Sequence, residues 1–398
     1  MSKQIQDAYI VSTVRTPVGK APRGVFRNTR PDDLLAHVLR AALAKAPGVD
    51  PARIGDAIIG CAMPEAEQGM NVARIGVLLA GLPDSLPAVT INRFCSSGLQ
   101  AIAMAADRIR LGEADLMLAG GTESMSMVPM MGHKIAFNPA AFDNEHVAIA
   151  YGMGITAEKV AERWKVDREA QDEFAYASHQ KALAAIAAGE FNDEIVPFTL
   201  ADHYPDLAAR TVRDDARQIA QDEGPRHDTN PALLAKLKPV FRLGGSVTAG
   251  NSSQMSDGAG AVLLASEQAL KDYQLTPLAR FVGFAVAGVP PEIMGIGPIA
   301  AIPKALAGSG IGKDQLDWIE LNEAFAAQSL AVVHDLGLDP AKVNPLGGAI
   351  ALGHPLGATG AVRTATLVHG MRRRGHKYGM VTMCIGTGMG AAGIFEAL

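Results

Sequence analysis

Short apolar runs of strand length alternate along the chain with longer stretches in which apolar residues recur every three or four positions. The second pattern predicts helices, for example over 32–46 and 71–80. Strands that alternate with helices predict an α/β fold with a largely parallel sheet covered on both faces. The strand-like runs lie at 9–11, 56–60, 88–91, 115–119, 258–266, 279–282, 317–320, 380–383 and 390–398.

The same order of predicted elements occurs twice. Ala8 and Ala279 begin similar strands 271 residues apart, and Cys95 and His354 precede similar small-residue helices 259 residues apart. Offsets this close indicate that one α/β unit has been duplicated. We predict two α/β halves, namely residues 1–121 plus 250–271 for the N-terminal half and residues 272–398 for the C-terminal half.

Extra material at 122–249 separates the two halves, and we predict that it forms a loop domain laid over the sheets. It contains an alanine-rich helical stretch from Thr156 to Gly189, for which Thr156 and Glu158 resemble a cap and first turn. The methionine-rich run at 124–132 is more typical of a core or an interface than of a cofactor site.

Composition narrows the class of protein. Of the 398 residues, 48% are hydrophobic and 19% are charged, which supports a large core and argues against disorder. The net charge of −5 gives no electrostatic support for nucleic-acid binding. No run of 18 apolar residues predicts a membrane span. The odd number of cysteines and the lack of a signal-peptide pattern favour a reducing, cytoplasmic location.

Cys95 stands where a turn-prone Ser-Ser-Gly segment opens into an apolar helix. Free N–H groups and the dipole at a helix N-terminus stabilise an anion, so we expect this position to lower the pKa of the thiol. A buried, inert cysteine is the alternative that this stretch alone leaves open.

Four segments contain the candidate catalytic residues. The repeat places each of them after a strand or at the start of a helix, at equivalent ends of the two halves. Ligands bind at that edge in open parallel sheets, so we expect one site to combine them. Cys61 occupies the position equivalent to that of Asn322 and is interpreted as packing. The four segments contain Cys95, Asn322, His354 and Cys384.

These motifs resemble the thiolase family over essentially the whole chain, with the strongest likeness to its degradative 3-ketoacyl-CoA branch. The resemblance implies duplicated βαβαβαββ halves in five layers, α-β-α-β-α, with the inserted loop domain. It is carried by NRFCSSG at 92–98, NEAFA at 322–326, GGAIALGHPLGATG at 347–360 and CIGTGMG at 384–390, together with VRTPVGK at 14–20 and TAGNSSQMSDGA at 248–259.

The resemblance implies a Claisen-type acyl transfer of fatty-acid β-oxidation. Cys95 is the implied nucleophile, His354 its base, and Cys384 the proton donor to the acetyl-CoA enolate. The N–H groups of Cys95 and Gly386 form one implied oxyanion hole, and His354 with a water held by Asn322 forms the other.

The resemblance also implies coenzyme A as a substrate, with no permanently bound cofactor and no metal. Ala249 and Ser253 match the segment that contacts pantetheine, and Met294 and Phe325 match residues that line the acyl pocket. Arg226 matches a position that contacts the adenine nucleotide, and a solvated loop charge is its alternative.

One departure concerns the substrate. Gly152 stands where short-chain biosynthetic members carry a histidine, which favours longer or varied acyl chains. The alternatives are an acetoacetyl-CoA-forming thiolase, a non-catalytic acyl-CoA carrier on the same fold, and a ketoacyl synthase, whose second histidine would replace Cys384. Family members imply a homodimer or homotetramer, with a hydratase–dehydrogenase subunit as a further partner.

Overall fold

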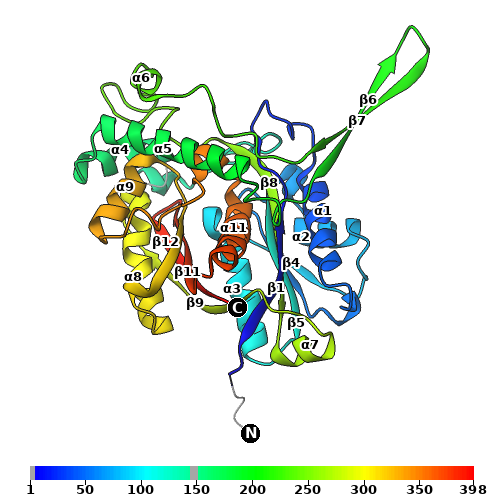
Figure 1. Ribbon diagram of the computed structural model, residues 1–398. Coiled ribbons are helices and arrows are strands. Elements are labelled where there is room, and N and C mark those ends of the chain that lie inside the picture. Colours follow the sequence, from blue (N-terminus) through cyan, green and yellow to red (C-terminus); the bar gives the residue numbers. More distant parts are fainter. Residues whose placement is uncertain (1–4, 144–150) are drawn as a thin grey trace.

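The computed structural model describes residues 5–143 and 151–398, so short pieces of the predicted N-terminal half and loop domain lie outside the described residues. Ten strands form one large sheet (Figure 1). These strands are β1 (Ala8–Arg15), β2 (Gly19–Lys20), β3 (Ala57–Gly60), β4 (Ala88–Ile91), β5 (Leu116–Ser124), β8 (Ser256–Ala265), β9 (Ala279–Gly288), β10 (Leu316–Leu321), β11 (Tyr378–Ile385) and β12 (Met389–Ala397).

The strand order confirms the duplication. It reads β10-β11-β12-β9-β1-β8-β5-β3-β4, so β3-β5-β8-β1 in one half matches β10-β11-β12-β9 in the other. The two copies meet where residues 8–10 of β1 pair antiparallel with residues 279–281 of β9. The position equivalent to β4 is reduced to one bridge between Ile319 and Val343.

The expectation of a largely parallel sheet is wrong. Only β3–β4, β3–β5 and β10–β11 pair in parallel, and the other pairings of this sheet are antiparallel. The reason is that the last strand of each half returns beside its predecessor: β12 follows β11 after a tight turn, and β8 lies antiparallel to β5. The sheet is therefore mixed.

The helices cover both faces of the folded sheet. They are α1 (Pro31–Ala44), α2 (Val72–Leu79), α3 (Ser97–Arg110), α4 (Met153–Arg163), α5 (Arg168–Ala187), α6 (Pro231–Leu234), α7 (Glu267–Asp272), α8 (Gly297–Ser309), α9 (Ala326–Asp335), α10 (Ala349–Leu352) and α11 (Thr359–Arg374). Figure 1 shows α3 and α11 in the centre, α1 and α2 on one outer side, and α8 and α9 on the other.

The three groups of helices and the two half-sheets form five layers, and three apolar clusters fill the spaces between them. Along β5, Met117 faces the central helices, whereas Leu116 and Leu118 face α1 and α2. Along β11, Val381 faces the central helices and Met380 faces α8 and α9. This alternation buries both faces of each half-sheet and confirms the five-layer arrangement.

The sequence predicts a strand over 115–119 that ends before Gly120. Strand β5 instead continues through Ser124, in register with β8. A Cβ at Gly120 would lie 2.3 Å from the carbonyl oxygen of Gly260, and one at Gly121 would lie 2.2 Å from that of Gly357. These two glycines therefore permit close backbone approach within a strand, and they do not form a turn.

The insertion differs from the predicted single helix at 156–189. Helix α4 begins three residues before Thr156, after Gly152, and α5 begins separately where the Asp167 side chain accepts a hydrogen bond from the N–H of Ala170. Residues 200–240, which are polar and interrupted by prolines, include most of a hairpin of β6 (Phe198–Asp206) and β7 (Thr211–Ile219) that projects from the body (Figure 1).

The two central helices cross at their first turns, where each contributes a glycine. A Cβ at Gly98 of α3 would lie 2.8 Å from the carbonyl oxygen of Gly357, and one at Gly360 of α11 would lie 2.1 Å from the backbone nitrogen of Leu99. Because backbone atoms form these contacts, no side-chain rotation can relieve them. The crossing holds the turns that precede both helices side by side.

We expect Gly360→Ala to lower the free energy of unfolding by about 2 kcal/mol or more, because a methyl group overpacks this crossing. Gly308→Ala on α8 is the matched control, since a Cβ there meets nothing within 4 Å. The control should be neutral or stabilising by about 0.5–1 kcal/mol, the gain of alanine over glycine in a helix. Denaturant unfolding of both variants measures the difference, and equal stabilities would contradict the close crossing.

Candidate active site

The segment around Cys95 is a tight turn between β4 and α3. Phe94 has a left-handed backbone with φ of +43°, and its N–H donates to Asn92 Oδ1 at 2.7 Å. Ser97 Oγ accepts from the N–H of Arg93 at 2.8 Å and donates to the carbonyl of Phe94 at 2.7 Å. Such local bonds hold a strained conformation that places Cys95 before the helix and not in its first turn.

The pKa expected for Cys95 was wrong in direction. Burial raises the pKa of its thiol to about 11, and the charge of Glu123 acts in the same direction. Two backbone N–H groups, of Gly386 and of Cys95 itself, oppose this shift without cancelling it. Desolvation of the thiolate therefore outweighs its stabilisation by N–H groups, and Cys95 rests as a neutral thiol.

His354 is held by a bond at each ring nitrogen. Nδ1 lies 2.6 Å from Thr359 Oγ1, and Nε2 lies 3.3 Å from Asn322 Nδ2. The backbone N–H of His354 donates to Ser256 Oγ at 3.0 Å. Burial, helped by the charge of Arg363, lowers the pKa of the imidazole to about 3. The ring is therefore neutral, and the Asn322 amide, donating to Nε2, leaves the proton on Nδ1.

Cys384 lies within strand β11 and not after it, and it is fully buried. Burial raises the pKa of its thiol, and ionisation of the neighbouring Cys95 would raise it further. The two segments are adjacent, since a Cβ at Gly386 would lie 3.8 Å from the ring of Phe94, the residue before Cys95. Gly386, two residues on, supplies the N–H that reaches Cys95. The end of β11 thus brings the second thiol and a backbone donor to the first.

Met294 and Phe325, the predicted acyl-pocket residues, pack in one apolar cluster with Cys384. Met153 joins this cluster, and its Sδ lies 3.8 Å from the position that a Cβ would take at Gly386. Met153 was not among the predicted site residues. Its position directly after the noted Gly152 was the available signal.

The residues matched to coenzyme A contacts are more dispersed. The N–H of Ser253 donates to the carbonyl of Ala324 at 2.9 Å, which joins this segment to the NEAFA motif, and Ala249 is exposed nearby in the chain. Arg226 is exposed and forms two hydrogen bonds with Asp228, while its backbone N–H donates to His179 Nδ1. The structure does not bring Arg226 into contact with the cysteines or His354.

The sequence predictions did not include two residues whose side chains make polar contacts in this region. Thr359 lies within the GGAIALGHPLGATG motif and binds His354, and Glu123 is a carboxylate at the end of a buried strand. Cys61 is fully buried, in line with its interpretation as packing, and its Sγ lies 3.8 Å from Glu123 Oε1. An acid that follows a fully apolar strand was the sequence signal for Glu123.

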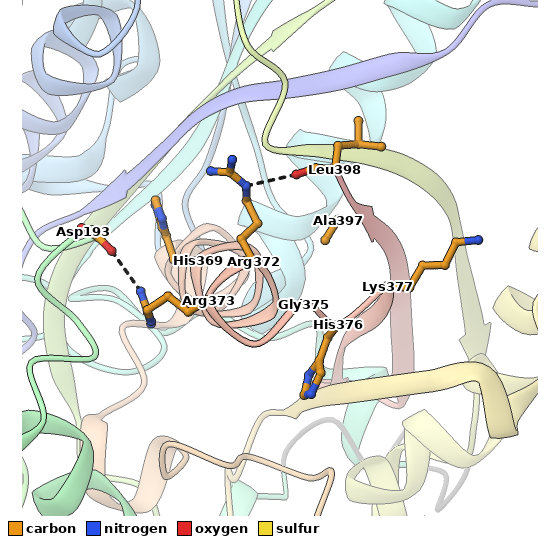
Figure 2. A pocket seen from close by; sticks show the side chains of 9 residues that line it. All are labelled: Asp193, His369, Arg372, Arg373, Gly375, His376, Lys377, Ala397 and Leu398. Carbon is orange, nitrogen blue, oxygen red and sulfur yellow. Dashed lines mark hydrogen bonds and ion pairs between the residues drawn. The ribbon is translucent and has the colours of Figure 1, made fainter.

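Two surface cavities, of about 630 and 660 Å³, lie away from this site. Figure 2 shows the first, around the end of α11, with none of the predicted site residues in its lining. Arg373 pairs there with Glu190 and Asp193. Arg373 belongs to the last turn of α11, with Arg372 and Arg374, where positive charge stabilises the helix dipole.

Within residues 5–143 and 151–398, no group of three or more His, Cys, Asp or Glu side chains is arranged to hold a metal ion. No helix in that part of the chain has the length and apolarity that a bilayer crossing requires.

The fold and the site together define a class of protein: a duplicated α/β protein in which the two central helices present a cysteine and a histidine beside a second cysteine. The models of the thiolase N-terminal domain and of the thiolase C-terminal domain match residues 8–268 and 275–397. The chain belongs to the thiolase family.

Similar proteins carry related names. A 3-ketoacyl-CoA thiolase of Bacillus subtilis is 52% identical over 98% of this chain and 100% of its own length, and the peroxisomal 3-ketoacyl-CoA thiolase A of Mus musculus is 48% identical over 98% and 91%. The crystal structure of human mitochondrial 3-ketoacyl-CoA thiolase is 40% identical with a TM-score of 0.88, covering 99% of both chains. That of Bacillus anthracis acetyl-CoA acetyltransferase is 40% identical with a TM-score of 0.89, covering 100% of both.

The raised pKa of Cys95 predicts how its alkylation depends on pH. Iodoacetamide reacts with the thiolate, which at a pKa of about 11 is only about one part in a thousand of the thiol at pH 8. We expect alkylation of Cys95 in the free protein to keep rising beyond about pH 9. Mass spectrometry of the Cys95 peptide measures the rate, with Cys95→Ala as the control, and a plateau near neutral pH would reveal a preformed thiolate–imidazolium pair.

Proposed function

We propose that this chain catalyses the coenzyme A-dependent cleavage of 3-ketoacyl-CoA into acetyl-CoA and a shortened acyl-CoA, as in fatty-acid β-oxidation. The observation that carries the proposal is the juxtaposition of Cys95 with Cys384 and the N–H of Gly386, in a protein of this family. The names of the B. subtilis and M. musculus relatives support the same substrate class.

In the first half-reaction, Cys95 Sγ attacks the C3 carbonyl while its proton passes to His354 Nε2. The neutral resting states of both groups mean that the charge develops during the attack. The bond between C2 and C3 then breaks, and C2 takes the electron pair together with a proton from Cys384. Acetyl-CoA leaves, and the acyl group remains on Cys95 as a thioester.

In the second half-reaction, the thiol of a new coenzyme A gives its proton to the Cys384 thiolate and attacks the acyl-Cys95 carbonyl. Cys95 leaves and recovers its proton from His354, so the site returns to its starting state. The N–H groups of Cys95 and Gly386 stabilise one developing oxyanion, and His354 with Asn322 stabilises the other. Two separate half-reactions make the kinetics ping-pong.

Coenzyme A is a substrate here and not a resident cofactor. Ser253 and Ala249 would contact its pantetheine arm, and Met294 and Phe325 would line the acyl pocket beside Cys384. Arg226 would meet the nucleotide end, in exchange for its bonds to Asp228. All three cysteines are free, which supports a reducing, cytoplasmic compartment.

The geometry at Gly152 favours longer acyl chains over dedicated acetoacetyl-CoA synthesis. Gly152 is exposed, and a Cβ there would meet nothing within 4 Å. The likeness to an acetyl-CoA acetyltransferase structure keeps the four-carbon reaction as the second candidate. A non-catalytic carrier would not need two cysteines and a histidine brought together.

The test is cleavage of a series of 3-ketoacyl-CoA substrates from four carbons upward, followed by loss of enolate absorbance. We expect turnover to extend to medium or long chains and to vanish in Cys95→Ala. Turnover confined to the four-carbon substrate would contradict the role of Gly152. Binding of coenzyme A without turnover would favour the carrier.

The exposed edge of the sheet supports association with a second copy. Among the described residues, strand β4 is the last in the order and pairs only with β3. Val89 on β4 is exposed, as are Leu78 and Leu79 at the end of α2, the helix that packs against β4. Unpaired apolar edges are normally covered. We therefore propose a homodimer joined at β4, or a homotetramer built from two such dimers. A hydratase–dehydrogenase subunit is a further partner proposed from the family resemblance alone.

We expect light scattering to give the mass of a dimer or tetramer, and Val89→Asp to lower it by placing a charge in the apolar edge. Met104→Asp on α3 is a matched control, because Met104 is equally exposed but lies elsewhere. A monomeric mass for the unmodified protein would contradict the proposal.

A further inference from the structure

Glu123 is a buried carboxylate that contacts both halves of the active site. It lies at the end of β5 and has no exposed surface. Its Oε2 accepts the N–H groups of Ala62 and Gly357, both at 2.8 Å, and its Oε1 accepts Gln68 Nε2 at 2.7 Å and the N–H of Met63 at 3.2 Å. Four donors compensate its charge where water is absent.

One set of these bonds leads to the nucleophile. The carbonyl of Ala62, whose N–H binds Glu123, accepts Asn92 Nδ2 at 3.0 Å. Asn92 Oδ1 in turn accepts the N–H of Phe94, the residue before Cys95. Three hydrogen bonds, through Ala62 and Asn92, therefore connect the carboxylate to the strained turn that carries the thiol.

A single bond leads to the base. Gly357 lies in the turn between His354 and Thr359, the residue that binds His354 Nδ1. The turn is pressed against the first half: a Cβ at Gly357 would lie 2.7 Å from the backbone nitrogen of Ala62 and 2.8 Å from Glu123 Oε2. Glu123 thus binds, through two neighbouring N–H groups on one oxygen, a residue from each half of the duplicated fold.

The charge of Glu123 also acts on the thiol. Burial raises the pKa of Glu123, and its N–H partners lower it, while its negative charge raises the pKa of Cys95. Among the groups on the segments packed around the Cys95 turn, Glu123 is the carboxylate whose charge raises the pKa of Cys95. Other titratable or charged groups on the segments next to the turn include Cys61, Arg93, His354, Arg363 and Cys384.

We propose that Glu123 is a positioning residue for the acyl transfer: its buried carboxylate holds the Cys95 turn and the His354 turn in register, and its negative charge adds to the burial that opposes ionisation of Cys95 before His354 takes the proton. The inference rests on the proposed function for its effect on turnover, but its effect on the thiol is independent of any substrate.

The test is Glu123→Gln, which keeps the size of the side chain and removes its charge. In this variant an NH₂ group replaces one carboxylate oxygen and faces two N–H donors, from which it cannot accept. The Cys95 turn and the His354 turn therefore lose the hydrogen-bond acceptor that they share. We expect kcat to fall by about 10- to 100-fold, the effect of displacing reacting groups by up to about 1 Å, with a much smaller change in KM. We also expect the pH profile of Cys95 alkylation to move to lower pH, so that alkylation at pH 8 becomes faster.

Glu194→Gln is the matched control. Glu194 is equally buried, and its Oε1 binds Arg15 at 2.6 Å and Thr366 at 2.8 Å. This variant should lose stability without moving the alkylation profile. Glu123→Asp retains the charge on a shorter side chain and should lower kcat with the profile unchanged, which keeps the test open where the Gln variant does not fold.

Each outcome decides the inference. An unchanged kcat in Glu123→Gln, an alkylation profile that stays at the wild-type position, or a profile that moves equally in Glu194→Gln or Glu123→Asp would overturn it. A shifted profile in a protein whose wild type cleaves no 3-ketoacyl-CoA would support the action of Glu123 on the thiol and overturn the proposed function instead.

Discussion

The close crossing of α3 and α11 is the constraint on which the site depends. At Gly98 and Gly360 each helix meets the backbone of the other segment, so the separation of the two helices is set by backbone contact and not by adaptable side chains. A tight turn precedes each helix and carries Cys95 in one half and His354 in the other. The half-sheets on either side bury the crossing, and a wider separation would leave voids in the central cluster that contains Leu99 and Leu367.

Burial at this crossing determines the chemistry as well as the geometry. It raises the pKa of Cys95 and lowers that of His354, so both groups rest uncharged. A neutral thiol needs a neutral base that is already oriented, and the bonds of His354 to Thr359 and Asn322 provide this orientation. In the proposed reaction, charge then develops only during the attack, next to the N–H groups of Cys95 and Gly386.

Local sequence patterns predicted much of the fold, including the strand at Ala88–Ile91, the helix after Cys95 and the duplication of the α/β unit. They failed where tertiary contacts decide. The strand predicted at 115–119 was too short, because Gly120 and Gly121 continue it and permit close approach to β8 and to Gly357. The strand directions were misjudged because apolar content reports burial on two faces and not the direction of the neighbouring strand. The motifs predicted which residues assemble around Cys95, but not its pKa, because desolvation depends on residues distant in sequence.

The duplication brings together two equivalent turns that carry different side chains, which gives one site its proposed nucleophile and its proposed base from a single repeated scaffold. The support beneath these turns is not duplicated. The strands β5 and β11 are related by an offset of 264 residues, which separates Leu116 from Met380. The same offset makes Thr387 the position equivalent to Glu123, and Thr387 carries no charge and has a left-handed backbone. One carboxylate is sufficient because Glu123 Oε2 accepts an N–H from each half, Ala62 from the first and Gly357 from the second. A second buried anion at this crossing would add desolvation cost and further oppose ionisation of Cys95. The duplicated fold therefore needs only one carboxylate, because the duplication places an N–H group from each half next to the same oxygen.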